Sequence, residues 1–307
     1  MKIFVIGGAG FVGRNLVKSL IENNHNVTIF DNLSNSSEKN IQPLLDKVNF
    51  VKGDITNYDD VSNSIKGSCV VIHLASKINV QESFLNPELT KNVNVKGTKN
   101  LLEACQENNI TNVIVASSAA VYGDCKDSKV YLSENAKTNP VSPYGESKLE
   151  MEKIVKILSK QHGFNAIILR FFNIYGTGQS PEYAGVITKF LQKIKENKSL
   201  EIFGDGMQTR DFISIGDAVT SFYNAISKID GKNGSTYNIA TGKSISINDL
   251  ASLMISICGK DLKIIHSVTK EGDIKFSQAD ISLAEKELGF QPKIELKDGI
   301  KNLMQTL

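Results

Sequence analysis

The feature that most constrains the fold is a run of glycines directly behind the first strand-like segment. The β-prone residues Lys2–Ile6 lead into Gly7, Gly10 and Gly13, and an amphipathic helical pattern, Val12–Glu22, follows. A strand, a glycine-rich turn and a helix N-terminus together form a pyrophosphate site, because glycine lets backbone N–H groups come close to the phosphates. A glycine-rich turn without a ligand is the alternative. The predicted dinucleotide-binding residues of this turn are Gly7, Gly10, Phe11, Val12 and Gly13.

Up to about residue 170 the chain repeats this alternation of short β-branched runs and longer helical patterns. Such alternation predicts a doubly wound (Rossmann) α/β fold, a parallel sheet with helices on both faces. Strands are expected at Lys2–Ile6, Val27–Phe30, Val48–Lys52, Cys69–His73, Asn112–Ala116 and Ala166–Arg170, and helices at Val12–Glu22, Leu89–Glu107 and Ser142–Lys160.

The alternation of strands and helices ends after Arg170, where glycines and a proline indicate loops around one predicted helix, Gly185–Glu196. The segment Tyr237–Ile239 again resembles a strand of the first sheet. We therefore expect residues 1–170 plus about 217–245 to form a dinucleotide-binding domain. Residues 171–216 and 246–307 are expected to form a smaller, discontinuous lobe, with the substrate in the cleft between the two.

Charge and composition exclude several classes of protein. The 35 Lys and Arg residues nearly balance 33 Asp and Glu, and a net charge of +2 is too small for a nucleic-acid or membrane footprint. The four cysteines form no C-x-x-C pair, so neither a metal site nor a disulfide framework is indicated. No stretch reaches 18 apolar residues. We expect a cytoplasmic protein with a small-molecule partner.

An acidic residue ends the second predicted strand. Asp31 lies 18 residues beyond Gly13, where a carboxylate can accept hydrogen bonds from a ribose 2′-hydroxyl. Its neighbour Asn32 is polar, and no arginine follows to bind a 2′-phosphate, so NAD is favoured over NADP. Asp54 and Ile55, after the third strand, can contact the adenine. An ordinary turn aspartate is the alternative for both acids.

A tyrosine and a lysine share one face of a predicted helix. Tyr144 and Lys148 are four residues apart, so their side chains can enter one pocket. A nearby ammonium lowers the pKa of a phenol, which starts near about 10, and makes Tyr144 a base for hydride chemistry at an alcohol. Ser118, at the end of the fifth strand, can donate a hydrogen bond to the same substrate oxygen. A surface pair and a strand-ending serine are the alternatives.

These motifs, taken together, resemble the extended short-chain dehydrogenase/reductases and, within them, the UDP-hexose 4-epimerases. The resemblance covers essentially the whole chain. It rests on Gly7–Gly13, Asp31–Ser34, His73–Ser76, Asn94–Thr98, Ser118–Gly123, Tyr144 with Lys148, Arg170–Gly176, Ile202–Gly206, Arg210–Phe212 and Glu271–Asp273.

The resemblance implies a role for each matching residue. Ser118, Tyr144 and Lys148 form the catalytic set, and a homodimer is expected through the two long helices Leu89–Glu107 and Ser142–Lys160. The cofactor would contact Tyr144 and Lys148 together with Leu74, Ala75, Ser76, Asn94 and Phe171. The uridine diphosphate would be held by Asn173, Gly185, Val186, Phe203, Arg210, Lys270 and Asp273. Arg210 suits this role because a guanidinium binds phosphate oxygens with two parallel hydrogen bonds. A solvated surface arginine is the alternative. Relatives often carry arginine at the position of Lys270.

Two further positions bear on the reaction. Ala119 and Ala120 stand where related dehydratases carry an acidic pair, so dehydration lacks a catalyst. In the family, the position of Ser277 borders the hexose, and a small side chain there leaves room for an N-acetyl group. We therefore expect an NAD-dependent epimerase acting on UDP-glucose and UDP-galactose, and on their N-acetylated counterparts. A uronate epimerase, a 4-reductase and a non-catalytic NAD-binding sensor are the alternatives.

Overall fold

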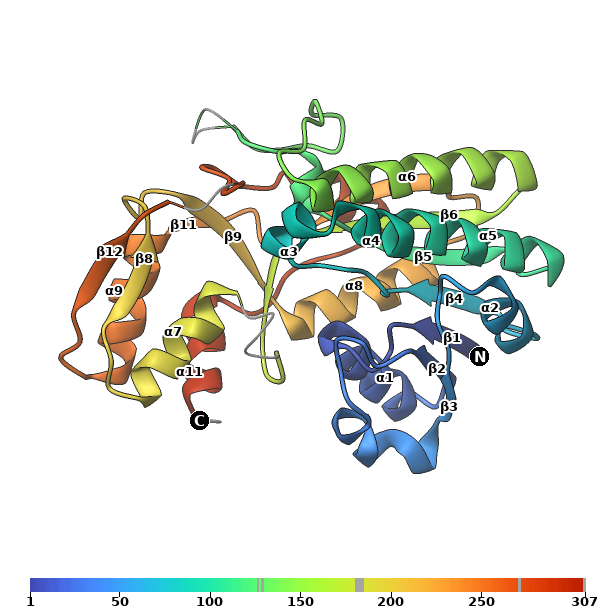
Figure 1. Ribbon diagram of the computed structural model, residues 1–307, viewed down its shortest axis with the longest axis horizontal. Helices are drawn as coiled ribbons and strands as arrows, with labels where there is room; N and C mark the ends of the chain where they lie inside the picture. Colours follow the sequence, from blue (N-terminus) through green and yellow to red (C-terminus); the bar gives the residue numbers. More distant parts are fainter. Residues whose placement is uncertain (126, 128–129, 180–184, 270–271, 306–307) are drawn as a thin grey trace.

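A seven-stranded parallel sheet organises the N-terminal part of the protein (Figure 1). The computed structural model describes residues 1–125, 127, 130–179, 185–269 and 272–305. The strand order is β10-β6-β5-β4-β1-β2-β3, so the chain reverses direction across the sheet between β1 and β4. This arrangement confirms the predicted doubly wound fold. The strands are β1 (Lys2–Ile6), β2 (Asn26–Asp31), β3 (Asn49–Lys52), β4 (Val70–His73), β5 (Asn112–Ser118), β6 (Asn165–Phe171) and β10 (Asn233–Ile239).

Successive residues of each strand point into two separate hydrophobic cores. In β1, Ile3 and Val5 pack on the face covered by α1 and α8, whereas Phe4 and Ile6 pack on the face covered by α2, α5 and α6. Both faces are therefore buried, as a parallel sheet requires. The helices of these two layers are α1 (Phe11–Glu22), α2 (Tyr58–Ser64), α5 (Gly97–Glu107), α6 (Pro143–His162), α8 (Ile215–Ser227) and α10 (Ser282–Leu288).

The predicted helix Leu89–Glu107 is interrupted. It consists of α4 (Pro87–Lys91), a π turn (η3, Asn92–Lys96) and α5. The π turn contains Asn94, whose side chain makes four hydrogen bonds to neighbouring elements. The wider turn accommodates these tertiary contacts, and hydrophobic periodicity does not reveal it. Besides α2 and α10, short elements that the sequence did not predict include η1 (Glu38–Asn40), η2 (Gln42–Lys47), α3 (Val80–Leu85) and η4 (Ala119–Val121).

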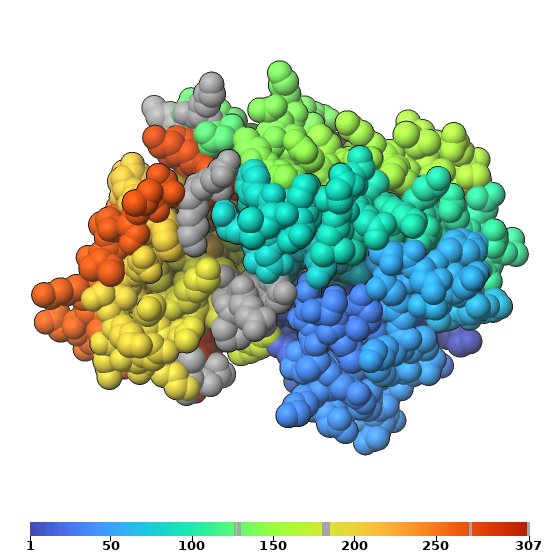
Figure 2. Space-filling view, viewed as in Figure 1, coloured from blue at the N-terminus to red at the C-terminus, as the bar shows by residue number. Residues whose placement is uncertain are grey.

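The remaining elements gather around a separate core at one end of the molecule, on the left in Figures 1 and 2. One small sheet has the order β11-β9-β7, and β8 pairs with β12. The predicted helix Gly185–Glu196 is α7, but the surrounding strands are too short to give a periodic signal. These elements are β7 (Asn173–Tyr175), α7 (Val186–Lys195), β8 (Leu200–Phe203), β9 (Thr209–Ser214), β11 (Ser244–Ser246), α9 (Ile247–Cys258), β12 (Ile264–Ser267) and α11 (Leu296–Gln305).

The chain re-enters the large sheet through β10, which pairs with β6 in parallel, as predicted for Tyr237–Ile239. The division into two domains at the bounds given above stays a prediction. Among the described helices, none has both the length and the apolar character needed to cross a bilayer.

Candidate active site

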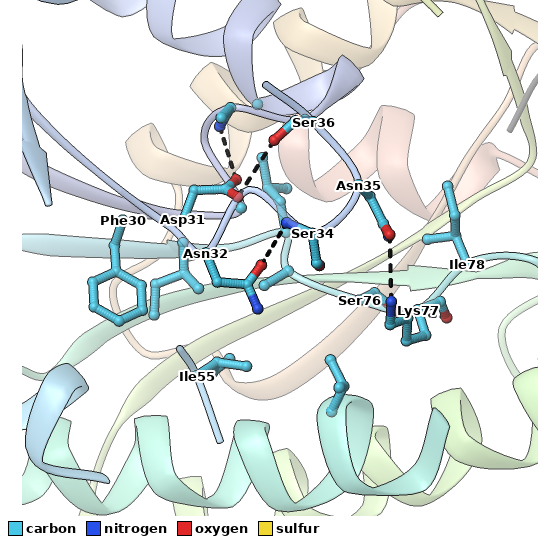
Figure 3. Close-up of a pocket in the computed structure, with 18 of the residues that line it drawn as sticks. Phe30, Asp31, Asn32, Ser34, Asn35, Ser36, Ile55, Ser76, Lys77 and Ile78 are labelled. Atoms are coloured by element: carbon cyan, nitrogen blue, oxygen red, sulfur yellow. Dashed lines mark hydrogen bonds between the residues drawn. The ribbon is translucent and has the colours of Figure 1, made fainter. Parts of the chain in front are cut away.

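A cavity of about 370 Å³ lies at the carboxyl ends of β1, β2 and β4. Such an edge, next to the point where strand order reverses, is where open α/β sheets bind ligands. Figure 3 shows the wall around Asp31, with the loop after β2 facing the loop after β4. The predicted cofactor residues that line it are Gly7, Gly10, Phe11, Val12, Gly13, Asp31, Asn32, Asp54, Ile55, Leu74, Ala75 and Ser76.

The glycine bend is packed too closely for side chains. A Cβ atom on Gly13 would lie 2.3 Å from the carbonyl oxygen of Gly7, and one on Gly7, whose φ is +79°, would lie 2.5 Å from the backbone nitrogen of Ala75. The N-cap of α1, Gly10, supplies no side-chain hydrogen bond, and the first turn holds no acidic residue. The first N–H groups of α1 therefore have the geometry and the positive field that a pyrophosphate needs.

Asp31 is fixed at the wall of the cavity before any ligand binds. Its carboxylate accepts hydrogen bonds from the backbone nitrogens of Ala9, at 3.0 Å, and Leu33, at 2.8 Å. Burial raises the pKa of Asp31, while these bonds and one from Ser36 oppose the rise. The side-chain amide of Asn32 donates a hydrogen bond to the carboxylate of Asp54 at 2.9 Å. This bond links the loop after β2, which carries the predicted ribose contact Asp31, to the predicted adenine contact Asp54. This wall fits the adenosine half of NAD.

Asn94 lies behind the cavity wall instead of lining it. Its carboxamide accepts from the Ser76 hydroxyl at 2.9 Å and from the Lys77 backbone nitrogen at 2.8 Å. It donates to the Lys77 carbonyl and to the hydroxyl of Ser147 on α6. Phe171 is also off the cavity lining, packed in the core with its ring 5.3 Å from that of Phe222. Both residues support the site from behind.

Two cationic side chains that the sequence analysis did not predict line the cavity. The guanidinium of Arg14 lies against Gly178, where an added Cβ would be 2.3 Å from its Nη2. Burial lowers the pKa of Arg14, and no ion pair to it occurs among the described residues. Lys77 reaches across to Asn35 at 3.4 Å, as Figure 3 shows. Their position directly after two recognised motifs is the signal that could have revealed them.

The structure brings Ser118 and Tyr144 together. Ser118 ends β5, and Tyr144 stands in the first turn of α6, whose N-cap Ser142 accepts from the backbone nitrogen of Gly145 at 3.1 Å. A Cβ on Gly145 would lie 2.7 Å from the carbonyl oxygen of Ala120, so glycine allows α6 to approach the end of β5. The side chain of Ser118 interacts with the hydroxyl of Tyr144, and the phenol is buried.

Lys148 lies one turn further along α6 and is also buried. Its ammonium donates to the carbonyl of Ala116 at 3.0 Å. Burial lowers the pKa of Lys148 to about 8, against a rise caused by Glu152. Burial also raises the pKa of Tyr144, and the interaction with Ser118 only partly opposes this. In the protein alone the pKa of Tyr144 is therefore raised and not lowered as expected, because burial disfavours the charged phenolate.

The predicted diphosphate contacts lie around the smaller sheets. Arg210 of β9 forms an ion pair with Asp273, and Asn173 of β7 donates to the carbonyl of Asp211 at 3.1 Å. Burial lowers the pKa of Arg210, while Asp273 and Asp124 raise it. Ser277 is buried. It follows Phe276, which forms an isolated antiparallel β-bridge with Cys125. Gly185 and Val186 begin α7, Phe203 is a partly buried residue at the end of β8, and Lys270 lies outside the described residues.

Comparison with known proteins agrees with this geometry. Residues 3–240 match the model of the NAD dependent epimerase/dehydratase family. The chain is 41% identical to a Methanocaldococcus jannaschii protein named "Putative UDP-glucose 4-epimerase", over 99% of this chain and 98% of that one. The chain therefore belongs to the NAD-dependent epimerase/dehydratase family, and NAD is its cofactor.

Two solved structures are similar over nearly the whole chain. One is the UDP-glucose 4-epimerase of Thermotoga maritima with UDP-glucose, which is 31% identical with a TM-score of 0.93, covering 99% of this chain and 98% of that one. The other is the UDP-N-acetylglucosamine 4-epimerase of Methanobrevibacter ruminantium, which is 32% identical with a TM-score of 0.89, covering 100% and 99%.

Proposed function

We propose that this enzyme inverts the configuration at C4 of a UDP-hexose through a transient 4-keto sugar. The observation that carries the proposal is the interaction of Ser118 with the buried phenol of Tyr144, one helical turn from the buried Lys148, at the sheet edge that also forms the cofactor cavity. Both relatives named as epimerases in the solved structures share this fold over nearly their whole length.

Tyr144, Ser118 and Arg210 have separate roles in the proposed reaction. Bound NAD⁺ supplies a hydride acceptor for C4 and a positive charge that favours ionisation of the buried phenol. Tyr144 takes the proton of the sugar 4-hydroxyl, while Ser118 donates a hydrogen bond to the same oxygen. Arg210 holds the diphosphate in a fork, so that the 4-keto sugar can turn over without leaving. When the ketone is reduced again on its opposite face, Tyr144 would return the proton to the same oxygen, so that its own protonation state is restored.

Incubation without added cofactor tests this function. The purified enzyme is mixed with UDP-glucose, UDP-N-acetylglucosamine or UDP-glucuronate, and the products are identified by NMR. Formation of the C4 epimer of either of the first two supports the proposal, since the net redox change is nil and NAD need not be replenished. Epimerisation of UDP-glucuronate alone would assign a uronate epimerase instead, and turnover only with added NADPH would assign a 4-reductase.

Ser277 is the proposed determinant for the substituent at C2. Its side chain is small and buried, and tyrosine at this position would occupy the space of an N-acetyl group. We expect Ser277→Tyr to lower kcat/KM for UDP-N-acetylglucosamine by about 10-fold to 200-fold, the range that one volume change in a pocket produces, and to spare UDP-glucose. Steady-state rates with both sugars measure this. Equal loss for both would contradict the assignment.

Arg14 is expected to bind the pyrophosphate of NAD. A charged hydrogen bond contributes about 1.5–3 kcal/mol, so Arg14→Gln should weaken NAD binding by about 10-fold to 100-fold. Isothermal titration calorimetry of NAD into nucleotide-free enzyme measures the change. Lys18→Gln, one turn further along α1 at an exposed position, is the matched control. An Arg14→Gln affinity equal to that of the control would show that the guanidinium only packs against Gly178.

We also propose a homodimer in which α5 and α6, which lie side by side in Figure 1, pack against their copies. Leu101 and Leu102 do not contribute to this surface, because both are buried in this chain's own core. Light scattering distinguishes a dimer from a monomer.

A further inference from the structure

A fully buried ion pair joins the predicted catalytic helix to the central sheet. Arg170 of β6 donates from Nε to Glu152 Oε1 at 2.9 Å and from Nη2 to Glu152 Oε2 at 2.7 Å. The two side chains are 3% and 1% exposed. Glu152 belongs to α6 and also accepts from the hydroxyl of Ser117 at 2.6 Å. The mechanism described above uses none of these three groups.

The same guanidinium extends the contacts toward the smaller lobe. Nη1 of Arg170 donates to the hydroxyl of Tyr122 at 2.9 Å and to the carbonyl of Glu134 at 3.1 Å. The Tyr122 hydroxyl donates to Asn238 at 2.6 Å, and Asn238 donates to the carbonyl of Asp280 at 3.1 Å. Arg170 is therefore the centre of a buried polar cluster that reaches the segment following Ser277.

Two members of the cluster adjoin predicted catalytic residues. Ser117 directly precedes Ser118, so its bond to Glu152 fixes the end of β5 against α6. Glu152 lies four residues after Lys148, on the same face of α6. A shift of about 1 Å in such supports can reduce a rate by about 100-fold, because the reacting groups leave their productive geometry.

We propose that Glu152 and Arg170 are a positioning pair that holds Ser118 and Lys148 in register for the reaction. The inference rests on the proposed function and adds to it two residues that touch neither cofactor nor substrate. Arg170 anchors the Glu152 carboxylate, and that carboxylate orients β5 through Ser117 and balances the ammonium of Lys148.

The charge of Lys148 gives a readout that separates positioning from simple packing. The ionisable groups that face Lys148 are Tyr144 and Glu152 on its own helix and His73 on β4. Burial lowers the pKa of Lys148 to about 8, and the negative charge of Glu152 opposes this effect. Loss of that charge lowers the pKa of Lys148 further. The ammonium is then lost at lower pH, and the alkaline limb of kcat moves to lower pH.

Glu152→Gln is the first test, with Glu150→Gln as the matched control. Glu150 lies on the same helix, and its side chain is 44% exposed in an ion pair with Lys91. We expect Glu152→Gln to lower kcat by about 10-fold to 100-fold with little change in KM, and to move the alkaline limb to lower pH. The control should keep the wild-type values. Rates are expressed per NAD-bound enzyme, so that any unfolded protein in the preparation does not lower the apparent kcat.

A double variant guards against misfolding of the single one. Replacing only Glu152 leaves Arg170 buried without its counter-charge, whereas Glu152→Met with Arg170→Met removes both charges at similar volume. We expect the double variant to fold, as judged by circular dichroism, with the same low kcat and shifted limb. Wild-type kcat and an unchanged limb in the folded double variant would overturn the positioning pair. A wild-type enzyme that epimerises no UDP-hexose would instead overturn the proposed function.

Discussion

Tyr144→Phe is expected to abolish nearly all turnover while leaving the fold intact. The substitution removes one hydroxyl, whose partner is Ser118, and keeps the buried ring. Loss of a positioned base reduces rates by about 10²-fold to 10⁴-fold, so kcat should fall by at least about 100-fold. Loss of the hydroxyl and its interaction with Ser118 should change the free energy of unfolding by only about 1 kcal/mol. The rate with UDP-glucose measures the loss of turnover, and unfolding in urea measures the change in stability.

Tyr131→Phe provides the matched control, because it removes the same group from a side chain that is 58% exposed. Its kcat and stability should equal those of the wild type. A Tyr144→Phe enzyme that keeps more than a tenth of wild-type kcat would assign the proton transfer to another group.

Gly13→Ala is expected to have the largest effect on the cofactor. The new Cβ would lie 2.3 Å from the carbonyl oxygen of Gly7 and 2.6 Å from the Cα of Gly8, and both contacts are with backbone that must move. Overpacking of this kind costs about 1–3 kcal/mol of stability, and the displaced bend no longer presents its N–H groups to the pyrophosphate. We expect the free energy of unfolding to fall by about 2 kcal/mol and NAD binding to be lost in calorimetry.

Gly216→Ala is a suitable comparison, since Gly216 occupies the first turn of α8 and its Cβ would meet side-chain atoms alone, the tip of Ile294 at 3.2 Å and the Ser214 hydroxyl at 3.8 Å. That variant should bind NAD normally. Retention of NAD by Gly13→Ala at wild-type affinity would show that the bend tolerates a shift, and the close packing described here would then not be needed for binding.

The sheet and its glycine bend could be predicted from sequence because their signals are local. A strand buried on both faces reads as a continuous apolar run, and the bend's glycines follow a fixed spacing. Asp31 was found from its place at the end of a strand, where topology alone puts it at the ligand edge. The wall residues from Leu74 to Ser76 needed the family resemblance, since nothing in their chemistry marks them.

The features that sequence did not reveal depend on tertiary contacts. The π turn around Asn94 forms where one side-chain amide contacts both the loop after β4 and helix α6, and hydrophobic periodicity does not reveal such contacts. The sequence does not distinguish Arg14 from other arginines on helix surfaces. Its contact with Gly178, which is distant in the sequence, becomes visible only in the structure. The pKa of Tyr144 was misjudged because spacing shows the neighbouring charge but not the burial that opposes it.

Asn94 has a consequence for how the enzyme works through a cycle. One carboxamide grips both the loop beside the cofactor cavity and helix α6, which carries Tyr144. The cofactor wall and the helix that carries the proposed proton-transfer residue are thus tied together by one side chain. In the proposed reaction we therefore expect the 4-keto sugar to rotate between the two hydride transfers, while the cofactor wall and Tyr144 keep their relative positions.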